Sequence, residues 1–410
     1  MNRGFFNRFD LTLLLTTILI VATGVVAIYS ATYGGTNIGD VYLKQMIFGL
    51  VGFVIIIVLT YLPPRYIAQS SYILYIISII MLLLVLKFGK TINGNKSWFF
   101  IGGFGIQPSE FAKIATVLAL SNFLSNSEEK KDPNNLLNFL RAGLIIGIPF
   151  ILIKMQPDTG TSLVFLSILI PVLFWAGLNP FWVIALVSPA LIAVLAFFGK
   201  FYFIAGLAAL LVVMFMFKRG WIWSSFILGI NTIIGFSVNI LYLKLKPYQQ
   251  KRIESLFDPS ADPLGSGYNV IQAKVAIGSG GFFGKGYLAG TQTQLKFIPE
   301  QWSDFIYCMI GEEFGFVGAI LVLVLYCIII IKFINNASLS KNRFLSLSCI
   351  GFGTIFLVHV TINIGMTIGI MPVIGIPLPM LSSGISSLLS FMFMVGIGMN
   401  AYRNRNIYMT

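Results

Sequence analysis

Two carboxylates, Glu300 and Asp304, stand at the end of a long polar stretch, directly before an apolar segment that begins at Phe305. An acidic group at the edge of a membrane helix is costly to dehydrate, so it indicates a functional site. At such a boundary the pKa of a carboxyl group is raised, which suits a general base or acid. Alternatively, Asp304 only caps the helix that begins at Phe305.

A second set of charges enters an apolar segment in the motif QPSEFAK, residues 107–113. Glu110 and Lys113 are three residues apart, so on a helix they share one face. An acid and an ammonium group that enter the membrane together predict an ion pair facing a cavity or another helix. A pair that only fixes helix packing is the alternative.

Three further polar positions are candidates for the same site. Trp98 is either an anchor at the membrane interface or a substrate contact. In QPDTG, residues 156–160, Asp158 either caps the next helix or joins the other polar groups at the outer face. Ser382 lies in the segment 369–387, just after three prolines that interrupt the helix. Broken helices at membrane depth occur where the backbone faces protein or a cavity, so this segment is expected to line one.

Basic residues in the stretch 244–304 are candidates for binding an anion. Arg252, Lys274 and Lys285 could neutralise a pyrophosphate, and the N–H groups of the glycine-rich run 278–286 could cradle its oxygens. A solvated basic face is the alternative. The glycine spacing does not match a nucleotide-binding P-loop.

The elements that position these residues are membrane helices. The chain has 410 residues, of which 57% are hydrophobic and 10% charged. This composition and the length of the apolar runs predict an all-α polytopic membrane protein with about 10–12 transmembrane helices. The predicted spans are 11–33, 42–62, 70–87, 108–126, 142–156, 160–177, 180–198, 202–217, 221–243, 305–332, 344–367 and 379–400.

The distribution of Lys and Arg at the span ends predicts the orientation. Both termini are expected in the cytoplasm, with the loops 88–107 and 244–304 outside. Residues 268–277 have a helical apolar pattern that favours a re-entrant or surface-lying helix. We expect a single membrane domain over residues 1–410, with the chemistry in these two loops and the adjoining spans.

Composition also excludes several classes of function. The net charge is +13, but there is no soluble basic domain to bind nucleic acid, so anionic membrane lipids are the expected partner. The cysteines lack metal-site spacing. The single histidine, His359, has no clustered ligand partner in the sequence, so no zinc site is expected.

Taken together, the motifs resemble those of the SEDS family (shape, elongation, division and sporulation), over nearly the whole chain. The motifs that carry the resemblance occur in the family's order, and they are QPSEFAK, QPDTG, DPLGSGYN, IQAKVAIGSGG, FIPEQWSDFIY, GEEFG and GIPLPMLSSGISS. The branch of the family that acts in rod-shape elongation is the most similar, with the division and sporulation branches close to it.

The resemblance implies a peptidoglycan glycosyltransferase of the bacterial cytoplasmic membrane. Members polymerise lipid II, an undecaprenyl-pyrophosphate-linked disaccharide-pentapeptide, and work with a class B penicillin-binding protein. The family's essential loop aspartate falls on Asp304, its functional tryptophan on Trp98, and its membrane-embedded pair on Glu110 and Lys113. Asp304 is then expected to deprotonate the acceptor sugar, while basic residues or a divalent cation (Mg²⁺ or Mn²⁺) offset the pyrophosphate charge.

The sequence departs from the family pattern at two places. Trp302 and Ser303 replace a His and a Thr beside Asp304, which argues against a required imidazole there or against full activity. Ser383 and Ile385 replace residues of the family's SYGGSS motif. Members typically have ten spans, so the apolar residues near 199–243 predict an extra pair. A lipid II flippase and a non-catalytic scaffold for the penicillin-binding protein are the alternative functions.

Overall fold

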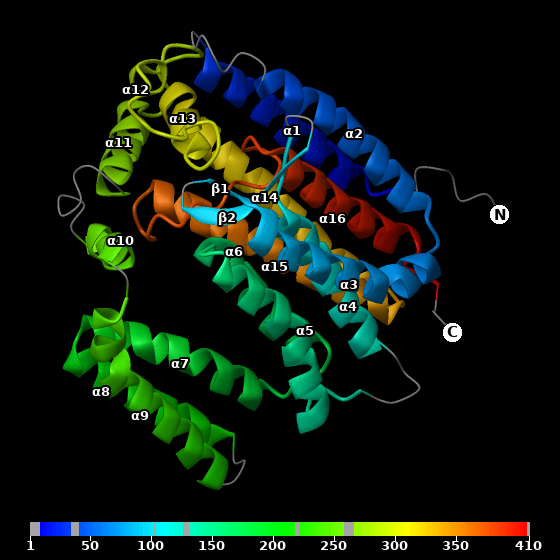
Figure 1. The fold of residues 1–410 in the computed structure, drawn as a ribbon, viewed down its shortest axis with the longest axis vertical. Coiled ribbons are helices and arrows are strands. Elements are labelled where there is room, and N and C mark those ends of the chain that lie inside the picture. Colours follow the sequence, from blue (N-terminus) through cyan, green and yellow to red (C-terminus); the bar gives the residue numbers. More distant parts are fainter. Residues whose placement is uncertain are drawn as a thin grey trace.

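The computed structural model of the chain describes residues 9–33, 41–92, 94–101, 104–125, 131–217, 221–245, 247–257 and 266–407. Residues 262–265 of the DPLGSGYN motif lie outside these ranges. The described chain is a bundle of long helices with one small sheet (Figure 1). Among the described residues, nine helices are long and apolar enough to cross a membrane.

The first nine predicted spans and the span over 344–367 each coincide with one helix, and the apolar residues near 199–243 do form two further helices. The helices that correspond to the spans before residue 244 are α1 (Leu11–Thr32), α2 (Val41–Tyr61), α3 (Pro64–Phe88), α4 (Pro108–Ser125), α5 (Leu136–Met155), α6 (Thr159–Trp175), α7 (Pro180–Phe198), α8 (Lys200–Met216) and α9 (Trp221–Leu243). The later ones are α14 (Gly315–Leu339), α15 (Arg343–Thr367) and α16 (Ile385–Arg403).

The prediction of one continuous span over 305–332 is wrong. The chain forms a short helix, α13 (Ile306–Glu313), and then turns at Phe314 and Gly315, where α14 begins. Gly315 has a φ of +65°, and a Cβ there would collide with the backbone nitrogen of Gly284. Glycine is therefore required both for the backbone conformation and for the close approach of the neighbouring loop.

The span predicted over 379–400 also begins later than expected, at Ile385. The preceding residues, 370–384, include three prolines and are not helical in the structure. Proline lacks a backbone N–H and clashes with the preceding turn, which explains why the helix cannot start earlier.

The loop 88–107 contains a small antiparallel sheet, which the all-α prediction did not include. Its strands are β1 (Lys90–Ile92), β2 (Asn95–Ile101) and β3 (Phe104–Ile106), in the order β1-β2-β3. The sheet leads directly into α4, and the backbone N–H of Gln107 donates to Ser386 Oγ at 3.1 Å. This contact ties the sheet to the start of α16.

The described part of the stretch 244–304 contains three helices, namely α10 (Pro247–Phe257), α11 (Ser266–Ser279) and α12 (Thr291–Gln294). With 14 residues, α11 is too short to cross a bilayer, as expected for a surface or re-entrant helix. Figure 1 shows α11, α12 and α13 grouped at one end of the bundle.

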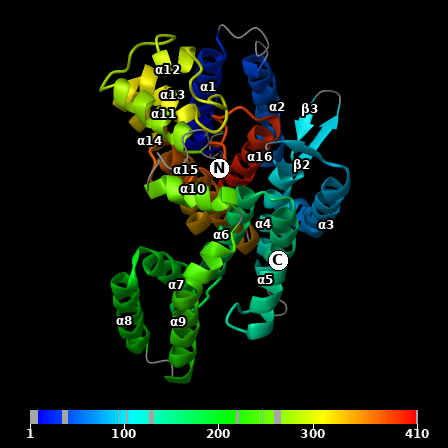
Figure 2. The same cartoon turned by 60° about the vertical axis from the view of Figure 1, so that its left-hand side comes forward.

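The described residues form three hydrophobic clusters. One joins α11 to α13 and the turn before it, through Ala273, Ala276, Ile298, Phe305 and Cys308. The other two hold the long helices. The larger one is centred on the buried helices α4, α15 and α16. The smaller one joins α7, α8 and α9 through Phe181, Phe203 and Ile227. Figure 2 shows these three helices as a unit that projects from the main bundle.

Side-chain contacts bring the beginning of α1 and the end of α16 to the same end of the bundle. Asp10 caps α1 and accepts from Lys332 Nζ at 3.0 Å. The aromatic ring of Tyr61 lies near Phe9 and stacks against the Arg403 guanidinium, 3.8 Å from the ring centroid. Both ends of the described chain therefore lie on one side of a membrane-spanning bundle.

We expect Gly315→Ala to destabilise the protein by about 1–3 kcal/mol, because the new methyl group adds backbone strain and a collision. The measurement is the midpoint of thermal unfolding in detergent. Gly143→Ala is the matched control: Gly143 lies within α5 with open space at its Cβ position. Equal midpoints for the two variants would show that the turn does not depend on glycine.

Candidate functional site

Asp304 lies in the turn before α13, and its backbone is held at both ends. Its N–H donates to the Glu300 carbonyl at 3.1 Å, and its own carbonyl accepts from Asn363 Nδ2 at 2.8 Å. The N-cap of α13 is Phe305, and no side chain caps that helix. The interpretation of Asp304 as a helix cap is therefore wrong, and its carboxylate is free for another role.

The carboxylate of Asp304 lies against the backbone of Gly375, whose φ is +75°. A Cβ at Gly375 would be 3.1 Å from Asp304 Oδ2. Burial, and to a smaller extent the charges of Glu300 and Asp158, raise the pKa of Asp304 to about 7, although the charge of Arg252 lowers it. The side chain stays partly accessible to solvent. Such a group changes protonation near neutral pH, as a general base must.

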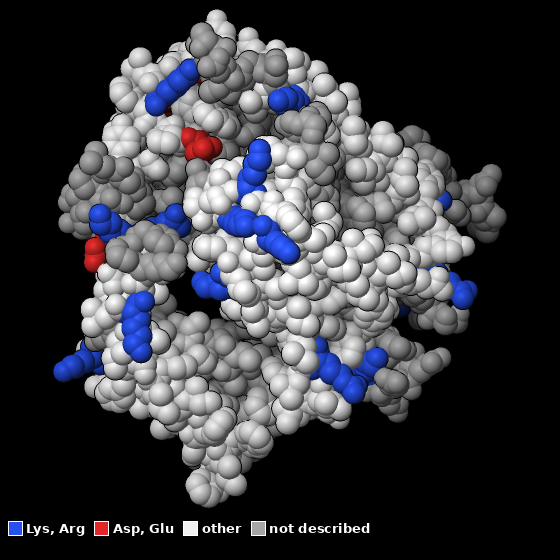
Figure 3. Space-filling view, in the orientation of Figure 1, with Lys and Arg blue, Asp and Glu red and all other residues white. Residues whose placement is uncertain are grey.

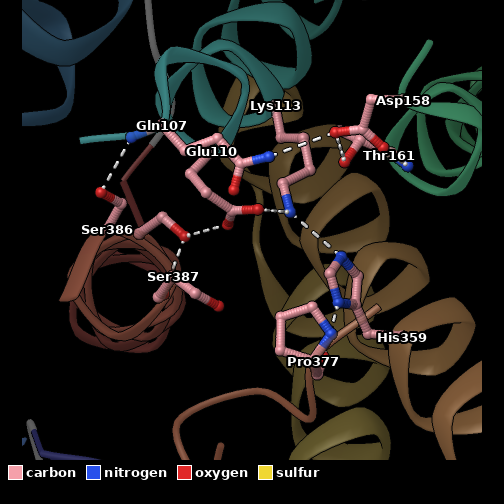
Figure 4. Close-up of polar contacts among 10 residues, drawn as sticks. Gln107, Glu110, Lys113, Asp158, Thr161, His359, Pro377, Ser386 and Ser387 are labelled. Carbon is pink, nitrogen blue, oxygen red and sulfur yellow. Dashed lines mark hydrogen bonds and ion pairs between the residues drawn. The ribbon is translucent and has the colours of Figure 1, made fainter. Parts of the chain in front are cut away.

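Asp158 caps α6, as one of its two interpretations predicted. It accepts from the backbone N–H of Thr161 at 3.0 Å and from the Thr161 hydroxyl at 2.8 Å, and Gln107 Nε2 donates to it at 3.2 Å (Figure 4). Two residues on, Gly160 lies so close to Ile374 and Ile376 that any Cβ would be 2.9 Å from each side chain. The start of α6 thus packs against the same segment that contacts Asp304.

Glu110 and Lys113 form the predicted ion pair, with 2.9 Å between Lys113 Nζ and Glu110 Oε1, and both side chains are buried. Ser390 donates to the other oxygen of Glu110 at 3.0 Å. Lys113 Nζ also lies 3.0 Å from His359 Nε2, and His359 Nδ1 lies 3.0 Å from the Pro377 carbonyl (Figure 4). Because a carbonyl only accepts, Nδ1 donates to it and Nε2 accepts from the ammonium group.

Residues 374–382, which we call the proline segment, connect these parts. Its Ile376 carbonyl accepts from Asn363 Nδ2 at 2.7 Å. Ser382 Oγ donates to the Ser303 carbonyl and accepts from the Leu378 N–H at 2.9 Å. The proline segment therefore lies between the Asp304 turn, the start of α6 and the charged pair of α4.

The two departures from the family pattern meet at this place. The backbone N–H of Ser383 donates to the Trp302 carbonyl at 3.0 Å, next to the bond between Ser382 and Ser303. Trp302 is partly buried against the main hydrophobic cluster. Both departures thus lie along one backbone contact, which holds the residues directly before Asp304.

Of the predicted basic residues, Arg252 is the one whose charge lowers the pKa of Asp304. Lys285 instead forms an ion pair with the buried Glu312, at 2.9 Å. Lys274 is exposed on α11, and its ammonium group lies beside Gly369 in the turn after α15. Figure 3 shows many more basic than acidic side chains on the face in view.

The glycine-rich run does not form the predicted phosphate cradle over its last residues. The N–H groups of Gly284, Lys285 and Gly286 donate to carbonyls of the chain itself, at 2.8–3.1 Å. A Cβ at Gly280 or Gly284 would collide with the backbone of α13. The glycines allow close packing of the loop on α13 rather than access to a ligand.

Two other candidates have local contacts. Trp98 lies in β2, and its ring is 3.2 Å from the Cβ position of Gly105 on β3. Glu300 has a φ of +53° and accepts from Ser303 Oγ at 3.1 Å. Both bonds of Glu300, through its side chain and its carbonyl, shape the turn that carries Asp304.

Sequence reasoning missed His359 and Asn363 as parts of the site. The signal was present, since these are polar residues four apart in an apolar segment and therefore share one face of a helix. Gln107 and Ser390 were also missed. Their partners are distant in sequence, so no local pattern could have shown those contacts.

Comparisons with known proteins agree with the architecture. The family model described as "Cell cycle protein" (FtsW, RodA, SpoVE) matches residues 10–206 and 198–407. The chain is 34% identical to the peptidoglycan glycosyltransferase RodA of Treponema pallidum, over 96% of this chain and 97% of the relative. It is 35% identical to the peptidoglycan glycosyltransferase MrdB of Escherichia coli K12, over 97% and 94%. A solved chain from a study of polymerization and crosslinking by a peptidoglycan synthase complex matches with a TM-score of 0.72 and 26% identity, over 97% and 98%.

We expect Lys113→Met to destabilise the protein by about 3–5 kcal/mol, because the carboxylate of Glu110 then stays buried without its cation. The double variant Glu110→Gln/Lys113→Met should recover part of this loss. The measurement is the midpoint of thermal unfolding in detergent. Lys154→Met, at an exposed position of α5, is the control and should be nearly neutral. A single variant as stable as this control would show that the pair is not needed.

Proposed function

The chain belongs to the SEDS family of cell-cycle proteins, and we propose that this peptidoglycan glycosyltransferase polymerises lipid II with Asp304 as the general base. The observation that carries the proposal is the environment of Asp304. Its carboxylate lies against Gly375, its pKa is raised to about 7, and its backbone is bonded to α15. A base with a pKa near the working pH is the most effective kind.

In the proposed step, the Asp304 carboxylate accepts the proton of the 4-hydroxyl group on the acceptor sugar. The oxygen forms a bond to the anomeric carbon of the donor sugar as the bond from that carbon to the pyrophosphate oxygen breaks. Undecaprenyl pyrophosphate leaves with the bonding electrons, and the proton remains on Asp304. Each turn of this cycle adds one disaccharide to the glycan strand.

Arg252 is the basic residue that best fits the developing pyrophosphate charge, since its field already reaches Asp304. Lys274 is exposed and available on the neighbouring helix α11. A divalent cation, Mg²⁺ or Mn²⁺, is a further candidate. Among the described residues no three His, Cys, Asp or Glu side chains converge, so the phosphate oxygens of the substrate would supply most of its ligands.

The location and the partner are also parts of this proposal. We place the termini in the cytoplasm and the loops 88–107 and 244–304, with the catalytic turn, on the outer face of the cytoplasmic membrane. The similarity to RodA and MrdB supports a role in elongation. The match to a chain from work on a peptidoglycan synthase complex supports a class B penicillin-binding protein as the partner that crosslinks the strands.

The alternative of a lipid II transporter receives less support. A transporter needs charges that face a path for the substrate. Glu110 and Lys113 are buried and bonded to each other. The scaffold alternative does not explain why the pKa of Asp304 is raised into the range of a general base.

We expect Asp304→Asn to lower the rate of glycan synthesis by about 10²–10⁴-fold, because the amide cannot accept the proton. The measurement is polymerisation of labelled lipid II by the purified protein with its penicillin-binding partner, with products resolved on a gel. Asp132→Asn, at an exposed position before α5, is the control and should keep its activity. A full-length ladder from the Asp304 variant would refute the assignment.

The rate of glycan synthesis should also increase with pH up to a plateau. Asp304 with a pKa of about 7 must be ionised to act, so the rate should fall below pH 7 and level off above it.

Ionisation of Asp304 should lower the stability of the protein, because the folded protein holds this proton more tightly than the unfolded chain, in which the pKa is near 3.8. Above pH 7, Asp304→Asn should therefore melt at a higher temperature than the wild type. A lower melting temperature there would contradict the raised pKa.

A further inference from the structure

Two polar side chains of α15 hold consecutive carbonyls of the proline segment. His359 and Asn363 are one helical turn apart, and they lie 3.0 Å from the Pro377 carbonyl and 2.7 Å from the Ile376 carbonyl. Asn363 is fully buried. Because carbonyl groups only accept, the nitrogen of the Asn363 amide must point to Ile376, and the orientation of that amide is fixed.

The second amide hydrogen of Asn363 goes to the carbonyl of Asp304, at 2.8 Å. One side chain thus joins two segments that lie far apart in the sequence, namely the turn with Asp304 and the proline segment. The amide oxygen of Asn363 is buried and has no hydrogen-bond partner among the described residues. The two donated bonds therefore set the position of this side chain.

The two carbonyls that Asn363 binds, those of Asp304 and Ile376, lie directly beside the contact between the Asp304 carboxylate and the backbone of Gly375. Gly375 precedes Ile376, and its Cβ position is 3.1 Å from Asp304 Oδ2. Any change in the distance between the two backbones changes the place of the carboxylate. A shift of about 1 Å in a reacting group can lower a rate by on the order of 100-fold.

We propose that Asn363 is a positioning residue for glycosyl transfer: its amide group fixes the backbone of Asp304 to that of Ile376 and keeps the carboxylate against Gly375. This inference rests on the proposed function of Asp304. Asn363 does not contact the reacting atoms and acts through the place of Asp304 alone.

The test compares Asn363→Leu and Asn363→Ser with Asn400→Leu. Asn400 is a matched control, because it is also fully buried and its amide donates to two carbonyls, those of Leu59 and Leu62, both at 2.7 Å. These carbonyls lie at the junction of α2 and α3, far in sequence from the turn that carries Asp304. Rates of lipid II polymerisation are measured over a range of substrate concentration and pH, and melting in detergent is followed in parallel.

We expect both Asn363 variants to lose on the order of 10- to 100-fold in kcat, with little change in KM. The acid limb of the pH profile should move to lower pH, because a carboxylate released from Gly375 is better solvated and its pKa falls. Asn400→Leu should lower the melting temperature about as much as Asn363→Leu does. At temperatures where it is folded, its kcat and its pH profile should match those of the wild type.

Two results would overturn the inference. The first is an Asn363 variant with the kcat and pH profile of the wild type. The second is an equal loss of kcat in the Asn400 variant with no shift of the acid limb in any variant, which would make the role of Asn363 only structural. Asn363→Ser is the smaller change and serves if the leucine variant does not fold. If Asp304→Asn is itself fully active, the proposed function fails instead, and that outcome is distinct from both.

Discussion

The structure depends on one constraint, which is that the ammonium group of Lys113 is buried in an apolar bundle and must be bonded. Glu110 supplies the opposite charge, and His359 supplies a second acceptor. Since His359 then has only its other nitrogen to donate, it binds the Pro377 carbonyl. A charge on α4 thereby determines where the proline segment lies, and the proline segment determines the place of Asp304.

Much of the fold could be predicted from the sequence because the helices are long and apolar, and hydropathy is a local property. The turn at Gly315 could not, because it is required by the approach of Gly284, a residue from another segment. The small sheet was missed for a similar reason, since its strands are short and its contact with Ser386 is long-range.

The candidate site was predicted in part. The types and spacing of Glu110, Lys113 and Asp158 indicated their contacts, and the position of Asp304 at the edge of an apolar segment indicated a raised pKa. That Glu312 pairs with a basic residue was one reading of the sequence, but the identity of that residue, Lys285, was not evident, because the two lie 27 residues apart. The contribution of Asn363 depends on the backbone carbonyls of Asp304 and Ile376. Every residue has a backbone carbonyl, so the residue types could not predict these contacts.

The sequence separation of the contacts around Asp304 has a consequence for biosynthesis. Asp304 is bonded to Asn363 and lies against Gly375, while Asp158 is close to the same proline segment through Gly160. Membrane proteins are made from the amino-terminal side, and their helices enter the bilayer in that order. The nascent chain can therefore insert most of its helices before Asn363 and Gly375, which hold Asp304, have been made. The contacts that hold Asp304 can form only late in translation, after residues 363–375 have been made.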